Sequence, residues 1–113
     1  MKIYHNPRCN KSRKALAIVK KNTSAFEIVE YLKNPLTVEE IKVLLPQLNI
    51  KARELVRTQE AIWEEDYKGK ILTENEIINI MAKNPKLIER PIVEHNNKAI
   101  IGRPPENVLS LFT

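Results

Sequence analysis

The chain has 113 residues and carries a net charge of +5, from 19 Lys and Arg against 14 Asp and Glu. This length suits one hydrophobic core, so we expect a single domain over residues 1–113. The basic residues are spread along the chain and aromatics are only 5%, which argues against a nucleic-acid partner.

Targeting and metal signals are also missing from the sequence. No apolar run approaches the roughly 18 residues that span a bilayer, and MKIYHNPRC lacks the apolar core of a signal peptide. We therefore expect a cytoplasmic protein with no membrane partner. Two distant histidines and one cysteine do not make a metal site, and one cysteine cannot form an internal disulfide. Any redox chemistry must use a thiol from another molecule.

The first third of the chain reads as strand, helix and strand. Residues 2–5 contain strand formers and end at a turn signal, Asn6-Pro7. From Ser12 to Asn22 apolar residues follow the helical period, and the last turn is cationic. Residues 25–32 alternate in part and end at Asn34-Pro35, as a second strand would. This order predicts a parallel βαβ unit.

Two later helices carry matching start signals. Thr37 with Glu40, and Thr73 with Glu76, make capping boxes in front of helical apolar patterns. Between them, residues 51–70 predict one or two shorter helices.

The last third predicts two antiparallel strands and a helix. Residues 91–95 and 98–102 flank Asn96-Asn97, which tolerate the left-handed conformation of a tight turn. Pro104-Pro105 then opens a terminal helix. The whole predicts an α/β fold, a thioredoxin-like sandwich. It consists of a βαβ half, a helical insertion and a ββα half, with a mixed sheet of about four strands.

The only cysteine lies in HNPRCNKSR, where the first helix is expected to begin. A helix start and the nearby Arg8, Lys11 and Arg13 favour a thiolate over a thiol. The plain alternative is a small buried residue at a turn. The cationic surroundings favour Cys9 as a nucleophile.

Two neighbours of Cys9 have more than one possible role. Ser12 can hydrogen-bond the sulfur or cap the helix, and both roles are equally open. His5 can support the loop through a side-chain hydrogen bond, or it can be an ordinary histidine with a partner at the end of a strand.

Three further arginines stand out: Arg57 in LVRTQ, Arg90 in ERPIV and Arg103 in GRPPE. The last two directly precede prolines at the boundaries of the predicted hairpin. Each could be a solvated surface residue or an ion-pair member. A guanidinium also presents a planar fork of donors that suits a tetrahedral oxyanion. If the fold is thioredoxin-like, Arg90-Pro91 is the cis-proline peptide, which would put Arg90 beside the cysteine loop.

HNPRCNKSR resembles the active-site signature of the glutaredoxin-coupled arsenate reductases, a family with a thioredoxin-like fold. The similarity continues in order through YLKNPLT, ARELVRTQE, NPKLIERPIV and IGRPPENVL, so it covers essentially the whole chain. The resemblance implies that Cys9 is the nucleophile and that Arg57, Arg90 and Arg103 bind the oxyanion. It also implies supporting roles for His5, Ser12 and Arg13.

By the same resemblance, the reaction is reduction of arsenate to arsenite. Glutathione is a co-substrate, glutaredoxin is a protein partner, and no bound cofactor or metal is needed. A regulator that binds RNA polymerase is a rival, but that branch usually has Cys-x-x-Cys where this chain has Ser12. A glutathione-linked thiol reductase is a further alternative, for which three oxyanion-binding arginines would be superfluous.

Overall fold

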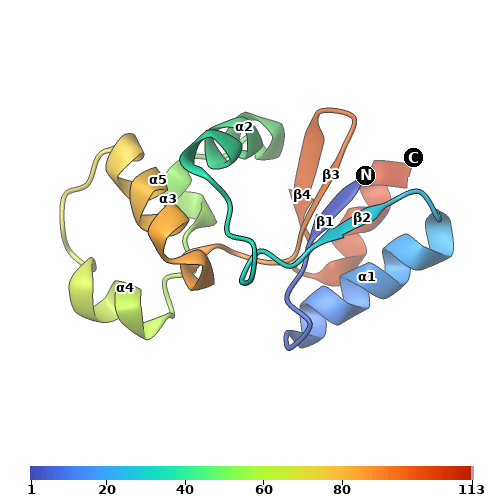
Figure 1. Cartoon of the computed structure of the whole chain (residues 1–113), viewed down its shortest axis with the longest axis horizontal. Coiled ribbons are helices and arrows are strands. Elements are labelled where there is room, and N and C mark those ends of the chain that lie inside the picture. The colour runs from blue at the N-terminus through green and yellow to red at the C-terminus, as the bar shows by residue number, and fades with distance from the viewer. Residues whose placement is uncertain (113) are drawn as a thin grey trace. The chain divides into compact units, whose positions relative to one another are not determined.

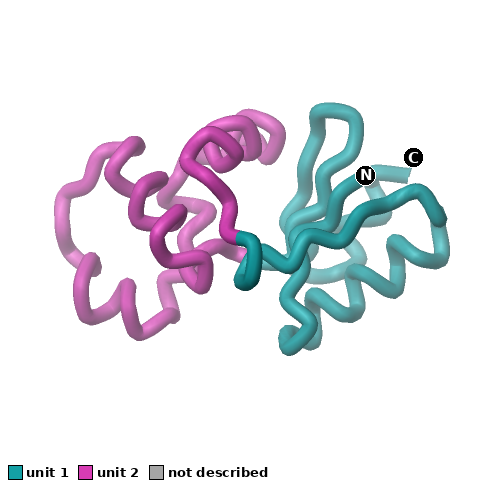
Figure 2. Tube along the Cα trace, viewed as in Figure 1, with its two compact units in different colours: residues 1–34, 90–113 teal, residues 35–89 magenta. Residues whose placement is uncertain are grey.

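Residues 1–112 are described by a computed structural model, in which the chain divides into two units (Figure 2). The first unit joins residues 1–34 to the segment that starts at Arg90, and the second consists of residues 35–89. The helical insertion expected from the sequence is therefore a unit of its own. The single domain expected over residues 1–113 stays a prediction.

A four-stranded mixed sheet organises the first unit (Figure 1). Its strands are β1 (Lys2–Tyr4), β2 (Glu27–Val29), β3 (Ile92–His95) and β4 (Lys98–Ile101), in the order β2-β1-β3-β4. β1 runs parallel to β2 and antiparallel to β3, and β3 pairs antiparallel with β4. This α/β arrangement with a mixed sheet confirms the predicted fold class.

Two helices supply the rest of the first unit's core, α1 (Asn10–Asn22) and the 3₁₀ helix η2 (Pro105–Phe112). They pack on each other, and their apolar side chains join those of β1 and β3 in one buried cluster. The cluster consists of Ile3, Ala15, Val19, Val93 and Val108. The predicted terminal helix is thus present, but it is wound as a 3₁₀ helix.

The second strand is shorter than the sequence indicates. Residues 25–32 were expected to be extended, yet β2 covers only Glu27–Val29. Its partner β1 has only three residues to pair with. Directly afterwards the carbonyl of Glu30 accepts hydrogen bonds from the backbone N–H groups of Lys33 and Asn34, so the chain turns there.

The β3–β4 turn confirms the expected hairpin. Asn96 and Asn97 have φ angles of 50° and 64°, the left-handed region that asparagine tolerates better than most residues. Arg90-Pro91 is a cis peptide, as predicted, and Arg103-Pro104 is a second one.

The second unit is helical, with α2 (Val38–Leu48), α3 (Ala52–Leu55), α4 (Ala61–Asp66), α5 (Glu74–Lys83) and the 3₁₀ turn η1 (Pro85–Leu87). Both predicted capping boxes are present. The side chains of Thr37 and Thr73 accept hydrogen bonds from the backbone N–H groups of Glu40 and Glu76, and the carboxylates of these glutamates accept from the backbone N–H groups of the two threonines. α5 contacts α2, α3 and η1. In residues 1–112, no helix combines the length and the apolar character needed to cross a membrane.

Candidate active site

The loop that carries Cys9 connects β1 to α1 and is closed by backbone hydrogen bonds. The N–H group of Cys9 donates to the carbonyl of Asn6 at 3.0 Å, and the Cys9 carbonyl accepts from Arg13 at 3.0 Å. Cys9 is the N-cap residue of α1, with extended backbone angles and no side-chain cap bond. α1 therefore begins at Asn10, two residues earlier than the apolar pattern indicated. The cysteine lies at the helix start, as expected.

The Cys9 side chain is half-buried. Burial raises the pKa of the thiol, but it is outweighed by three groups that stabilise the thiolate. These are the backbone N–H of Ser12, the guanidinium of Arg90, and the backbone N–H of Lys11. The net result is a thiol pKa below its ordinary value, as a nucleophilic cysteine requires.

His5 and Ser12 form a buried pair beneath this loop. The Nδ1 atom of His5 lies 2.6 Å from Oγ of Ser12, which also accepts from the backbone N–H of Asn6 at 3.0 Å. Ser12 is fully buried and His5 is nearly so. This hydrogen bond fits both roles open for His5, support of the loop and an ordinary histidine with a partner at the end of a strand. Of the roles open for Ser12, the hydrogen bond to the sulfur is present, made by its backbone N–H, whereas its hydroxyl bonds to His5 and Asn6 and the helix cap is Cys9.

Burial lowers the pKa of His5, an effect only partly opposed by the negative charge of Glu30. Lys20 and Arg13 lower it further. A neutral imidazole can accept at Nδ1, so the Ser12 hydroxyl can donate to His5 while it accepts from Asn6. The pair thus joins the end of β1 to the first turn of α1.

Arg13 and Asn6 shape the outer side of the loop. Arg13 donates from Nη1 to the carbonyl of Pro7 at 2.9 Å, so its side chain connects the first turn of α1 to the loop. Asn6 accepts at Oδ1 from the backbone N–H of Arg8 at 3.0 Å. The sequence analysis did not select Asn6 as a site residue, although an asparagine before proline is typical of such turns.

Two of the predicted arginines lie at the two ends of the β3–β4 hairpin in the same unit as Cys9. Arg90 precedes Pro91, and its side chain stabilises the thiolate of Cys9. Arg103 follows β4 and donates from Nη1 to the carbonyl of Arg90 at 3.3 Å. The structure therefore brings the side chain of Arg90 to Cys9 and the side chain of Arg103 to the backbone of Arg90.

Arg57 belongs to the second unit. Its backbone N–H donates to the carbonyl of Leu87, and its Nε lies 3.4 Å from a carboxylate oxygen of Glu60. Arg57 is thus half-buried and paired with a nearby carboxylate. This agrees with the alternative that Arg57 is a surface residue or an ion-pair member.

The chemistry available around Cys9 is that of an activated thiol. Its thiolate is held by N–H groups at a helix start and by a guanidinium, and a second arginine contacts the backbone of the first. Such an arrangement suits attack on a small oxyanion, because the same cations stabilise the negative charge of the ligand. Within residues 1–112, no group of three His, Cys, Asp or Glu side chains could hold a metal ion.

Comparison with known proteins defines the family. Residues 4–111 match the model of the ArsC family, and the chain belongs to that family. It is 47% identical over 113 residues to the uncharacterized protein YfgD of Escherichia coli strain K12, covering 98% of this chain and 95% of that protein.

Two further relatives are named for an activity. An arsenate reductase of Neisseria meningitidis serogroup A is 38% identical over 110 residues, covering 96% of this chain and 94% of that protein. A solved structure of an arsenate reductase from Vibrio cholerae superposes with a TM-score of 0.92 at 42% identity, covering 97% of each chain. These matches confirm the resemblance to arsenate reductases and the fold.

Proposed function

We propose that this protein reduces arsenate to arsenite, with Cys9 as the nucleophile. The observation that carries the proposal is the Cys9 thiol at the start of α1, with its pKa lowered by backbone N–H groups and by Arg90. Relatives named arsenate reductase, at 38% and 42% identity, support arsenate as the substrate. We place the reaction in the cytoplasm, where free thiols are maintained.

The first step joins Cys9 to arsenic. The thiolate attacks the arsenic atom of arsenate, a sulfur–arsenic bond forms, and one hydroxyl group leaves and takes a proton to become water. Arsenic remains in the +5 state. The backbone N–H groups of Lys11 and Ser12 stabilise the thiolate. Once the sulfur is bonded to arsenic, the same N–H groups can stabilise the negative charge of the oxyanion.

The reducing electrons come from two external thiols, because the chain has a single cysteine. Glutathione condenses with the arsenic adduct and releases a second water. A thiolate of glutaredoxin then attacks the glutathione sulfur, so that a disulfide forms and the sulfur–arsenic electron pair stays on arsenic. Water finally displaces Cys9 and releases arsenite. In sum, arsenate and two thiols give arsenite, one disulfide and one water.

The arginines have different support in this scheme. Arg90 and Arg103 are proposed to hold arsenate oxygens because they share the unit and the neighbourhood of Cys9. Arg57 is proposed as a third oxyanion ligand on the sequence resemblance alone. His5, Ser12 and Arg13 are proposed to hold the loop in shape through the hydrogen bonds described above.

The test is arsenite formation from arsenate with glutathione and glutaredoxin, leaving out each component in turn. Cys9→Ser should abolish turnover, while its circular dichroism spectrum stays that of the parent and its unfolding transition stays cooperative. Full residual turnover in that variant would reject Cys9 as the nucleophile. Turnover with glutathione alone would remove glutaredoxin from the scheme.

A regulator without catalytic activity predicts a different outcome. It would give no arsenite under any combination of thiols and would instead bind RNA polymerase. A glutathione-linked thiol reductase would reduce glutathionylated proteins at rates that Arg90→Ala and Arg103→Ala leave unchanged. The same preparations therefore distinguish all three functions.

A further inference from the structure

Asn6 lies just after β1 and bonds to the Cys9 loop through its backbone and its side chain. Its backbone N–H donates to Oγ of Ser12 at 3.0 Å. Its backbone carbonyl accepts from the N–H of Cys9, and its Oδ1 accepts from the N–H of Arg8, both at 3.0 Å. The residue is only 8% exposed. The reaction proposed above gives this buried asparagine no part.

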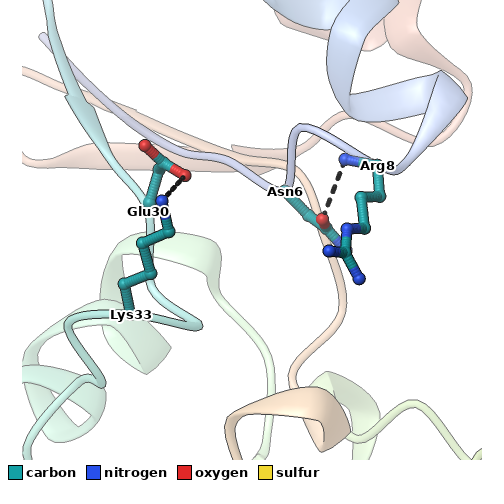
Figure 3. Close-up of polar contacts among 4 residues, drawn as sticks. All are labelled: Asn6, Arg8, Glu30 and Lys33. Atoms are coloured by element: carbon teal, nitrogen blue, oxygen red, sulfur yellow. Dashed lines mark hydrogen bonds and ion pairs between the residues drawn. The ribbon is translucent and has the colours of Figure 1, made fainter.

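The residues from Asn6 to Cys9 form a four-residue turn, closed by the bond from the Cys9 N–H to the Asn6 carbonyl. Pro7 takes the second position, where its fixed φ suits a turn, and it has no N–H of its own. The N–H at the third position is that of Arg8, and the Asn6 side chain accepts it (Figure 3). Both N–H groups between Asn6 and the start of α1 at Asn10 are therefore bonded to Asn6.

The backbone on the two sides of Cys9 is thus held by different groups. On the C-terminal side α1 holds it, since the Cys9 carbonyl accepts from the N–H of Arg13 at 3.0 Å. On the N-terminal side the turn made by Asn6 holds it. The φ and ψ of Cys9, −93° and 121°, set the direction of its side chain. A looser turn would therefore let the sulfur rotate away from the N–H groups of Lys11 and Ser12 that stabilise the thiolate.

One bond of Asn6 depends on the type of its side chain. Any residue at this position can make the backbone bonds to Ser12 and Cys9, whereas the bond from Arg8 needs a side-chain acceptor. Asparagine places this acceptor against the N–H two residues later, as in an Asx turn. Asn6 is not a member of the buried apolar cluster of the first unit, so this bond serves the loop and not the core.

We propose that Asn6 is a positioning residue for the reaction of Cys9: its side-chain carbonyl holds the turn ahead of Cys9 and thereby fixes the direction of the Cys9 side chain at the start of α1. Asn6 acts through the backbone of Arg8 and Cys9. The proposal rests on the proposed function in that Cys9 is the nucleophile there. The positioning itself is a property of the free protein, and it is measured without arsenate.

The rate of alkylation by iodoacetamide, at a pH below the midpoint of the thiol titration, reports the thiolate that the loop holds. Asn6→Ala should react about fivefold more slowly than the parent, the value of one hydrogen bond. Asn6→Ser, whose hydroxyl accepts more weakly from the same N–H, should react at an intermediate rate. Asn22→Ala is the matched control, because it also removes an asparagine bond to a backbone group of α1, and it should react like the parent.

A second readout follows the geometry at the sulfur. In the ¹⁵N-labelled parent, the amide signals of Lys11 and Ser12 should shift as Cys9 titrates, because their N–H groups stabilise the thiolate. These shifts should become smaller in Asn6→Ala and should stay unchanged in Asn22→Ala. A residue that only stabilises the fold would leave them unchanged in both variants.

Three results would overturn the proposal. In the first, Asn6→Ala is less stable in urea but keeps the alkylation rate of the parent. In the second, Asn6→Ser is slowed as much as Asn6→Ala, and in the third, Asn22→Ala is slowed as much as Asn6→Ala. If Asn6→Ala does not fold, the comparison of Asn6→Ser with the parent decides by the same two readouts. None of these measurements involves arsenite formation, so a failure of this proposal and a failure of the proposed reaction are distinguishable.

Discussion

Arg103 donates a hydrogen bond from its guanidinium to the backbone carbonyl of Arg90 at 3.3 Å. The bond ties together the two ends of the β3–β4 hairpin, because the Arg103 side chain reaches the backbone that precedes β3. In the proposed function both arginines hold oxygens of arsenate, whose negative charge would offset the repulsion between the two cations.

Loss of either arginine should impair the reaction more than it impairs the fold. We expect Arg90→Ala and Arg103→Ala each to lower kcat/KM for arsenate about 100-fold, the cost of removing one donor to a charged transition state. Lys14→Ala, a matched loss of an exposed cation on α1, should leave kcat/KM unchanged. Steady-state arsenite assays measure the effect, and equal kinetics in all three variants would assign both arginines to the surface.

The Cys9 thiol should titrate below its ordinary pKa. Burial raises this pKa, but the N–H of Ser12 and the Arg90 guanidinium lower it by more, so Arg90→Ala should raise it. The pH dependence of alkylation by iodoacetamide gives the midpoint directly. A midpoint that moves equally in Arg90→Ala and in Lys14→Ala would mean that net charge, and not the contact with Arg90, is responsible.

Ser12→Ala should destabilise the chain through two lost hydrogen bonds. The Asn6 N–H and His5 Nδ1 would both be left buried without this partner, at a cost of about 1–3 kcal/mol in the free energy of unfolding. Urea denaturation measures this cost. Ser24→Ala, at an exposed position before β2, is the matched control and should be nearly neutral.

His5 should make the stability depend on pH in one direction. Burial lowers its folded-state pKa below the ordinary 6.5, so below pH 6.5 the unfolded chain binds more protons than the folded one. The free energy of unfolding should therefore fall as the pH falls from 6.5 through the folded-state pKa of His5. His5→Gln should reduce this dependence in urea titrations, whereas His95→Gln should retain it.

The two glycines should respond differently to substitution. At Gly102 an added Cβ would lie 2.9 Å from Cγ of Pro91 and 3.2 Å from a methyl group of Val108, so Gly102→Ala should cost about 1–3 kcal/mol by overpacking. At Gly69 there is open space, but φ is +82°, so Gly69→Ala is strained by its backbone.

Asparagine separates the two causes. Gly69→Asn should be less destabilising than Gly69→Ala, since asparagine tolerates positive φ, whereas Gly102→Asn should be worse than Gly102→Ala. Thermal unfolding of the four variants gives both comparisons. The same ranking of alanine and asparagine at both positions would contradict this distinction.

Local signals in the sequence determined much of this protein. The capping boxes at Thr37 and Thr73, the Asn96-Asn97 turn and the helix start at Cys9 depend on neighbours within a few residues, so the sequence was sufficient to predict them. The ordered motifs around Cys9 and the arginines were likewise sufficient to indicate the family, which the comparisons confirm.

Only the tertiary structure decided how distant groups share their hydrogen bonds. The length of β2 depends on the three residues that β1 offers it, and the hydroxyl of Ser12 serves His5 and Asn6 because α1 packs against the end of β1. The contact between Arg103 and Arg90 depends on the hairpin that brings their backbones together. Such partners are chosen by proximity in the folded chain, which residue type and spacing do not specify.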